Sequence, residues 1–168
     1  MTPQRQQHPI PPLYDSESRV LILGSFPSVK SREGQFFYHH PQNRFWKVLA
    51  AVFRGQVPVT VAEKTVFLHD HHIALWDVIG SCEIVGSADS TIRQVEPNDL
   101  SPILSGAQIQ AIFCNGSTSW QYYKKYTQAK TGMEATPLPS TSPANAAWTL
   151  ERLTDAWGVI RSYLPELL

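Results

Sequence analysis

The sequence predicts an α/β domain of three layers, in which helices cover both faces of a central, mostly parallel sheet of about four strands. One observation is a set of short, continuous apolar runs, of which Val20–Leu23 is the clearest. Such runs are typical of parallel strands that are buried on both faces. A second observation is that segments with a helical spacing of apolar residues alternate with these runs. This alternation is typical of parallel sheets with helices on both sides.

The chain has 168 residues and shows no internal repeat or linker, so we expect a single folded domain over residues 16–168. Residues 1–15 contain four prolines and little periodicity, which predicts an irregular N-terminal arm. The sequence shows neither a signal peptide nor an apolar run of membrane-spanning length. We therefore expect an intracellular, cytoplasmic protein without a membrane partner.

The first half of the domain begins with the strand Val20–Leu23 and continues with an amphipathic helix. Pro41 lies near the start of this helix and Gly55 near its end. Its apolar residues fall at i, i+3, i+4, i+7 and i+8: Phe45, Val48, Leu49, Val52 and Phe53. The next segment, Val61–Leu68, is ambiguous and could form another helix.

The second half continues the alternation of strands and helices. We expect a short strand over residues 73–76, a polar loop through Ser90, and a short helix over residues 100–104 capped by Asn98 or Asp99. The expected elements that follow are a strand over 108–113, a turn at Asn115-Gly116, a helix over 117–126, a strand over 135–138 and a closing helix over 144–163.

The composition limits the classes of function. Lys and Arg together number 14, as do Asp and Glu, so the formal net charge is zero. A tight nonspecific binder of nucleic acid is normally basic, but a local basic face is enough for phosphate contacts. Candidates for such a face are Lys30, Arg32, Arg44, Lys47, Lys124 and Lys125. The two cysteines, Cys82 and Cys114, cannot supply a four-cysteine iron–sulfur cluster, and no cofactor is predicted.

The most informative segment follows the first strand. Gly24–Ser28 brings glycine, proline and serine to the carboxyl end of a buried strand, where open α/β sheets bind their ligands. Gln35–Trp46 then groups aromatic rings, histidines and amides. Aromatic faces beside amides and cations suit a flat, hydrogen-bonding ligand such as a nucleobase.

Three pieces of sequence carry a family resemblance: Gly24-Ser-Phe-Pro-Ser28, His40-Pro-Gln-Asn-Arg-Phe-Trp46 and Leu138-Pro-Ser-Thr-Ser-Pro-Ala-Asn145. They resemble motifs one and two of the uracil-DNA glycosylase superfamily, and most of all its hypoxanthine-DNA glycosylase branch. The resemblance extends from about Val20 to Trp157. One departure stands out, because Phe26 occupies the position of the water-activating asparagine in the mismatch-specific branch.

This resemblance implies a monofunctional DNA repair glycosylase that flips a deaminated base out of DNA and cleaves its N-glycosidic bond without a cofactor. Hypoxanthine is the favoured base and uracil the alternative. The implied partner is double-stranded DNA, with single-stranded DNA as a second form of substrate. We further expect a monomer, associated with the nucleoid if the source is bacterial.

Asn43 is the candidate catalytic residue. Phe26 cannot accept a hydrogen bond, whereas Asn43 supplies an amide oxygen close in sequence to the aromatic residues, and it matches the catalytic asparagine of the hypoxanthine branch. Its alternative role is to cap the helix that follows. Tyr38 is the candidate for stacking on the flipped base. The complete set of candidate base-binding residues is Phe26, Ser28, Gln35, Tyr38, His39, His40 and Asn115.

The block Ser140–Asn145 is the candidate DNA-binding loop, because the resemblance implies a loop here that enters the DNA and helps to expel the base. The candidate DNA contacts are Arg44, Ser140, Thr141, Ser142, Pro143 and Ala144. About 100 residues separate this loop from Tyr38 and Asn43. Since parallel strands have their carboxyl ends at one edge of the sheet, we expect the loop to lie beside both residues.

Two other classes of function are left open by the sequence. The run His69-Asp-His-His72 could ligate a metal ion in a hydrolase. The absence of a motif-one activator and the zero net charge would instead fit a nucleic-acid-binding protein without catalysis. Metal analysis of the purified chain tests the metal-hydrolase alternative. Release of a base from a lesion-containing duplex distinguishes a glycosylase from a protein that only binds nucleic acid.

Overall fold

The computed structural model describes residues 2–165, and its centre is a parallel sheet in the order β3-β2-β6-β7. These strands are β2 (Val20–Gly24), β3 (Ile73–Asp77), β6 (Ala111–Asn115) and β7 (Ala135–Leu138). Every residue of β2 from Val20 to Leu23 is completely buried, as its continuous apolar sequence predicts. The register pairs Val20 with Ile73 on one side and with Ala111 on the other, so all strands end at the same edge.

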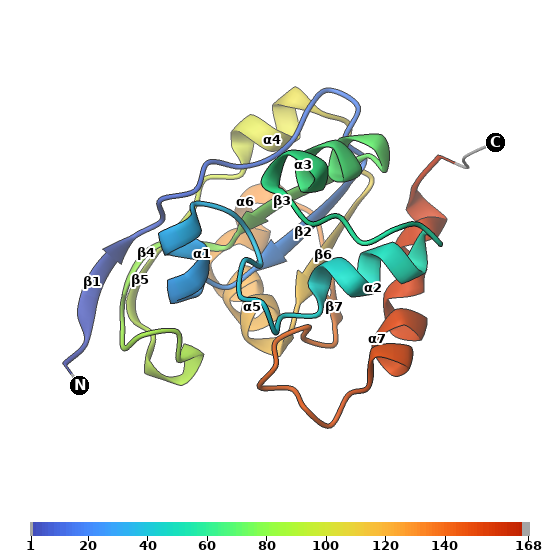
Figure 1. Ribbon diagram of the computed structural model, residues 1–168. Coiled ribbons are helices and arrows are strands. Elements are labelled where there is room, and N and C mark those ends of the chain that lie inside the picture. Colours follow the sequence, from blue (N-terminus) through green and yellow to red (C-terminus); the bar gives the residue numbers. More distant parts are fainter. Residues whose placement is uncertain (1, 166–168) are drawn as a thin grey trace.

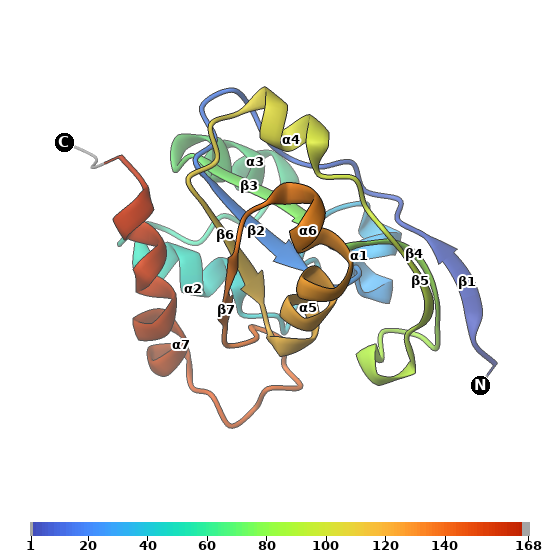
Figure 2. The same ribbon diagram turned by 180° about the vertical axis from the view of Figure 1, so that it is seen from behind.

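Helices cover both faces of this sheet, which confirms the three-layer α/β/α prediction (Figures 1 and 2). One face packs against α2 (Phe45–Val52), α3 (Val61–Asp70) and α7 (Leu150–Trp157). The other face packs against α4 (Ser101–Gly106), α5 (Ser117–Tyr122) and the π-helical turn η2 (Tyr123–Thr127) that leads into α6 (Gln128–Thr131). Helical segments therefore bury their apolar sides on opposite faces of one sheet.

A second, antiparallel sheet stands beside the parallel one in the order β1-β4-β5, and the sequence did not predict it (Figure 1). Its strands are β1 (Gln4–Gln7), β4 (Ile79–Ile84) and β5 (Arg93–Pro97). The expected irregular arm thus contains a strand, and the expected polar loop before Ser90 contains another. Small and polar residues interrupt β4, so it gives no clear strand pattern. Its pairing with both neighbours defines it instead.

Several other boundaries differ from the prediction. The ambiguous segment 61–68 is helix α3, and Thr60 and Glu63 form a capping box at its start. The strand expected over 108–113 is β6, displaced toward the C-terminus. The closing helix begins at Leu150 instead of Ala144, because Thr149 caps it and the preceding residues form a loop. It continues as the 3-10 helix η3 (Gly158–Tyr163).

Two further short elements complete the carboxyl edge of the parallel sheet. Helix α1 (Val29–Gly34) follows β2, and the 3-10 turn η1 (Asp89–Thr91) joins β4 to β5. Strand β1 of the expected arm pairs with β4 of the expected domain. The first residue of the expected arm, 1, and the last residue of the expected domain, 168, lie outside the described residues. None of the described helices has the length and apolar character needed to cross a membrane.

Candidate active site

A cavity of about 370 Å³ opens at the carboxyl edge of the parallel sheet, where the loops after all four strands meet. Most candidate residues from the sequence line it: Phe26, Ser28, Tyr38, His40, Asn43, Asn115 and Ser140–Ala144. The candidate DNA-binding loop Ser140–Asn145, called the second loop below, therefore lies beside Tyr38 and Asn43, as the sequence predicts. The meeting follows from the parallel topology, because it brings the ends of strands distant in sequence to one edge.

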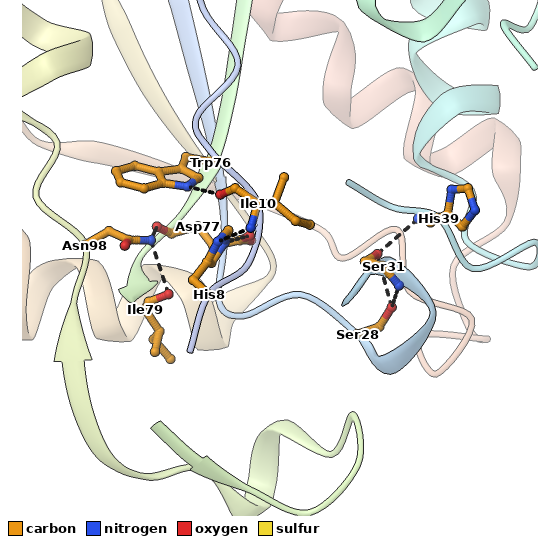
Figure 3. Close-up of polar contacts among 9 residues, drawn as sticks. All are labelled: His8, Ile10, Ser28, Ser31, His39, Trp76, Asp77, Ile79 and Asn98. Atoms are coloured by element: carbon orange, nitrogen blue, oxygen red, sulfur yellow. Dashed lines mark hydrogen bonds and ion pairs between the residues drawn. The ribbon is translucent and has the colours of Figure 1, made fainter. Parts of the chain in front are cut away.

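Three candidates do not line the cavity. Gln35 is the exposed C-cap of α1, and its side-chain amide donates to the carbonyl of Arg32 at 2.7 Å. The His39 ring packs on Gly34, where an added Cβ would lie 2.4 Å from the ring, and its backbone N–H donates to Ser31 Oγ (Figure 3). Local packing thus directs both side chains away from the site, contrary to the expectation of base contact.

Arg44 is the third candidate outside the cavity lining. Its guanidinium donates to the carbonyls of Ser142 and Asn145, each at 3.0 Å, and to that of Trp148. Its backbone N–H donates to the carbonyl of Thr141 at 3.0 Å. This arrangement fixes the second loop against the start of α2, and it occupies the group that we expected to contact DNA.

Asn43 belongs to a hydrogen-bond network centred on Thr141. Asn43 Oδ1 accepts from Thr141 Oγ1 at 2.8 Å and from the N–H of Phe45 at 3.0 Å. Asn115 in turn donates from Nδ2 to Thr141 Oγ1 at 2.9 Å and accepts the N–H of Thr141 at 3.0 Å. The completely buried Thr141 therefore links both asparagines, whereas Asn43 Nδ2 has no hydrogen-bond partner within residues 2–165. Asn43 precedes the N-cap residue of α2, Arg44, and its bond to the N–H of Phe45 also ties it to the first turn of that helix.

Tyr38 is held in a rare backbone conformation by its surroundings. Its φ of 49° lies in the left-handed region, which costs energy for a residue with a side chain. The ring stacks on the buried Phe45, with centroids 4.0 Å apart and an interplanar angle of 25°. Because Phe45 covers one face, a base can stack only on the other. Burial and the nearby Asp77 carboxylate raise the pKa of Tyr38, so its hydroxyl stays protonated.

Phe26 lines the cavity but presents no hydrogen-bonding group there. It is 7% exposed, and its ring meets the His8 ring edge-to-face at 5.9 Å, while the Arg32 guanidinium lies 5.5 Å from its centre. Ser28 caps α1 by accepting from the N–H of Ser31 at 3.2 Å. The loop Gly24–Ser28 thus contributes shape and, through Phe26, apolar surface to the cavity.

Asp77 is a site residue that the sequence analysis missed. It ends β3, lines the cavity and pairs through Oδ2 with His8 Nε2 at 2.7 Å (Figure 3). The side chains of His8 and Asp77 are only 3% and 6% exposed. An acidic residue directly after an apolar run was the available signal for Asp77. His8 gave no signal, because it lies in the segment expected to be an irregular arm.

A second carboxylate stands at the rim of the cavity. Asp89 accepts a hydrogen bond from Ser25 Oγ, which lies 3.1 Å from both carboxylate oxygens. Residue Asp89 as a whole is exposed, but desolvation of its carboxylate and the charge of Asp77 raise its pKa. The site therefore has a carboxyl group at its floor, Asp77, and a second one at its rim, Asp89.

The histidine run 69–72 does not assemble a metal site. His69 pairs with Asp15 at 3.0 Å, His71 stacks on Phe53 with ring centroids 4.1 Å apart, and His72 Nδ1 lies 3.1 Å from the carbonyl of Glu17. These three rings have separate partners, which contradicts the metal-hydrolase alternative. Within residues 2–165 no group of three or more His, Cys, Asp or Glu side chains is arranged to hold a metal ion.

Comparison with known proteins places this geometry in a family. The model of the uracil DNA glycosylase superfamily matches residues 11–161. The chain is 31% identical to the hypoxanthine DNA glycosylase of Methanosarcina acetivorans over 153 residues, which covers 90% of this chain and 96% of that protein. It is also 31% identical to the hypoxanthine DNA glycosylase of Methanosarcina barkeri over 137 residues, covering 80% and 85%.

The fold is similar to a solved structure as well. The solution NMR structure of a proposed uracil DNA glycosylase from Methanosarcina acetivorans aligns with a TM-score of 0.80 and 29% identity, covering 95% of this chain and 99% of that one. The match of the family model over most of the chain, together with this shared fold, shows that the chain belongs to the uracil DNA glycosylase superfamily.

Proposed function

We propose that this chain is a monofunctional DNA repair glycosylase that hydrolyses the N-glycosidic bond of a deaminated base, with hypoxanthine as the favoured base. The observation that carries the proposal is the cavity in which Tyr38, Asn43 and the second loop meet. Its volume lies within the range of about 300–1,000 Å³ that is usual for small-molecule sites. The names of the two Methanosarcina relatives support hypoxanthine over uracil.

The base enters the cavity after it has been flipped out of the duplex. Tyr38 provides a stacking surface on the face that Phe45 leaves open. Stacking a base on an aromatic ring contributes about 1–3 kcal/mol. The rigid support of Phe45 reduces the entropy lost when the base is bound, since the ring is already fixed.

Asn43 holds the attacking water in this proposal. Its Oδ1 already accepts two hydrogen bonds, so the amide N–H groups face the ligand and can donate to the water oxygen. As the bond between the sugar C1′ and the base nitrogen breaks, positive charge develops on the sugar. The electron pair of the broken bond leaves with the base, which takes up a proton from solvent. The water oxygen bonds to C1′ and gives up a proton to solvent, so one water molecule is added in total. This chemistry needs an oriented water but no strong base and no cofactor.

The second loop is proposed to contact the duplex. Pro143 and Ala144 lie at the mouth of the cavity, and the bonds of Arg44 to the loop carbonyls hold it in place. A rigid loop next to the site can fill the space that the flipped base leaves in the stack. The proposed partner is therefore double-stranded DNA, with a single protein chain acting on it.

The test is base release from matched duplexes that carry deoxyinosine, deoxyuridine or deoxyxanthosine, scored by cleavage of the resulting abasic sites. We expect release from the deoxyinosine duplex by the wild-type chain and much slower release by Asn43→Ala. A chain that binds these duplexes and releases no base from any of them would refute the glycosylase assignment and support the non-catalytic alternative.

A further inference from the structure

Two members of the basic face expected from the sequence, Lys124 and Lys125, lie together outside the cavity. They belong to η2, the π-helical turn that follows α5 on the face of the sheet opposite α2 and α7 (Figure 2). Both lysines are exposed, and within residues 2–165 neither forms an ion pair with a carboxylate. Their two positive charges are therefore available to an anion from outside the chain.

Aromatic rings hold the two ammonium groups in place. Lys124 Nζ lies 3.4 Å from the centroid of the Trp120 ring, and Lys125 Nζ lies 5.1 Å from that of Tyr126. Such a contact orients the ammonium group but leaves its full charge, because the ring is neutral. Trp120 itself is fixed, since its Nε1 donates to the carbonyl of Ala135 at 3.1 Å. The segment therefore presents oriented positive charges beside aromatic rings.

Two tyrosines of the same segment extend this aromatic surface. The rings of Tyr122 and Tyr126 are nearly parallel, with an interplanar angle of 17° and centroids 6.0 Å apart. Both residues are half-buried, so packing supports each ring while part of it meets solvent. Aromatic rings of this kind bind unpaired nucleobases by stacking, whatever the sequence. A base inside a duplex is already stacked between its neighbours, so the two tyrosines suit a single strand.

The backbone that carries these side chains departs from regular α-helix. Residues Tyr123–Thr127 form a π-helical turn, and the buried Thr127 Oγ1 has no hydrogen-bond partner within residues 2–165. Both features cost stability, because a π-turn is a rare conformation and an unsatisfied buried hydroxyl loses its bonds to water. Local departures of this kind are frequent at functional sites.

The tyrosine pair adjoins the rim of the cavity. Tyr122 packs against the apolar cluster that contains Phe26, a residue of the cavity wall. Burial, the neighbouring Tyr126 and the rim carboxylate Asp89 raise the pKa of Tyr122, and the exposed Arg93 of β5 partly offsets this shift. Since α5 begins at the carboxyl edge and leads back along the sheet, Tyr126 lies farther from the rim than Tyr122. A strand that leaves the cavity on this side meets the two tyrosines in turn.

We propose that this surface binds unpaired nucleotides of the DNA strand that carries the damaged base; the identity of the strand rests on the proposed function. The surface, called the α5–η2 surface, consists of Arg93, Trp120, Tyr122, Lys124, Lys125 and Tyr126. The lysines contact phosphates, and the two tyrosines stack on bases. Cations that follow the backbone beside rings that stack on bases are the usual means of binding a single strand. A local surface of this kind also allows a chain of zero net charge to bind DNA.

The test measures binding of a fluorescein-labelled oligothymidylate of about 12 nucleotides, a length within the range of about 4–16 that one such site covers. This probe requires neither a lesion nor catalysis. The double variant Lys124→Gln/Lys125→Gln should lower the slope of log affinity against log salt concentration by about 1.4, because each phosphate contact to a single strand contributes about 0.7. Arg19→Gln, which removes a cation paired with Glu17, is the matched control and should keep the slope.

Substitutions of Tyr126 test the stacking. Tyr126→Leu should weaken binding of the oligothymidylate about fivefold or more, which is the loss of one stacked base. Tyr126→Phe keeps the ring and should bind like the wild-type chain. Thermal melting identifies a variant that fails to fold.

Excision separates this surface from the catalytic machinery. On a fully paired deoxyinosine duplex, the lysine double variant and Tyr126→Leu should release hypoxanthine within about twofold of the wild-type rate. On the deoxyinosine single strand, at subsaturating enzyme, both should lose about as much as they lose in binding of the oligothymidylate. The rate at saturating enzyme should stay unchanged.

The outcomes separate this inference from the proposed function. If the variants bind the oligothymidylate with the wild-type affinity and salt slope while the wild-type chain releases hypoxanthine, only this inference is wrong. It is also wrong if they lose affinity for the duplex as much as for the single strand. If the wild-type chain releases no base, the proposed function is overturned, but loss of oligothymidylate binding in the variants would still establish a single-strand binding surface.

Discussion

The two edges of the parallel sheet carry hollows of different character. At the amino edge, a groove of about 550 Å³ is lined by Val52, Phe53, Arg54, His71, His72, Gly158, Arg161, Ser162, Leu164 and Pro165. At the carboxyl edge, the smaller cavity of about 370 Å³ contains Asn43, Thr141 and Asp77. Within residues 2–165, no side-chain hydrogen bond spans the walls of the groove. The cavity walls are joined by the Asn43–Thr141–Asn115 network and closed by His8 and Asp77.

The larger hollow is thus not the one with the buried polar network, so volume alone does not identify a site. Buried polar groups are costly unless they are hydrogen-bonded, so a paired buried network indicates a place where side chains are held in a fixed orientation. The carboxyl edge assembles such groups from the ends of all four parallel strands, while the histidines at the amino edge are occupied by local partners. Substitutions at each edge test this contrast.

Asn43→Ala should lower single-turnover excision of the base by about 10²–10³-fold, the usual cost of removing one well-placed polar group at a site where charge develops. Binding to a duplex that already contains an abasic site should change little, since the second loop is intact. The measurement is excision and binding on the same duplex. Excision at a near-normal rate would refute the role of Asn43.

Tyr38→Ala should lower excision at subsaturating enzyme by about 5- to 150-fold, which corresponds to the loss of about 1–3 kcal/mol of stacking. Tyr38→Phe should have little effect, because stacking requires the ring and not the hydroxyl. If Phe is as damaging as Ala while the melting temperature is unchanged, the hydroxyl is the operative group.

Thr141→Val should lower excision about fivefold to tenfold, because it removes the hydroxyl that orients Asn43 and costs about 1 kcal/mol or slightly more. Thr141→Ser keeps that hydroxyl and should keep most of the activity. The comparison of the two variants in single turnover isolates the hydrogen bond. Equal activity of Val and Ser would show that the network does not support catalysis.

Asp89→Asn should change the pH dependence of stability. The folded state raises the pKa of Asp89, so it binds a proton more readily than the unfolded state does. The free energy of unfolding of the wild-type chain therefore falls as pH rises from the ordinary carboxyl pKa through the raised one. The variant should lack this fall. The measurement is a series of denaturant titrations of both proteins from about pH 3.5, near the ordinary carboxyl pKa, to about pH 7.

Arg54→Ala and Arg161→Ala at the amino edge should leave excision within about twofold of the wild-type rate, as expected for surface substitutions that are distant from the chemistry. The measurement is single-turnover excision at several salt concentrations. A loss comparable to that of Thr141→Val would show that the amino-edge groove takes part in the reaction, and the contrast between the edges would fail.

Local pattern in the sequence was enough for most of the three-layer fold. A strand buried on both faces has a continuous apolar run, as β2 does, and a helix buried on one face has apolar residues at helical spacing, as residues 45–53 do. Each element could therefore be predicted from its own sequence. Parallel strands also allowed the meeting of Tyr38, Asn43 and the second loop to be predicted. These residues are brought together by topology, which the order of elements already implies.

The antiparallel sheet and the floor of the site depended on tertiary structure. Strand β4 is defined by its partners β1 and β5. The pairing of β1 with β4 joins positions from Gln7 and Ser81 to Gln4 and Ile84, which are far apart in the chain, and such a distant partner leaves no mark in the local sequence. Likewise, the His8–Asp77 pair forms only because β1 places the N-terminal arm beside the end of β3. Periodicity reports which face of an element is buried. Which buried polar groups become neighbours is decided by long-range packing, because each must find its hydrogen-bond partner elsewhere in the chain.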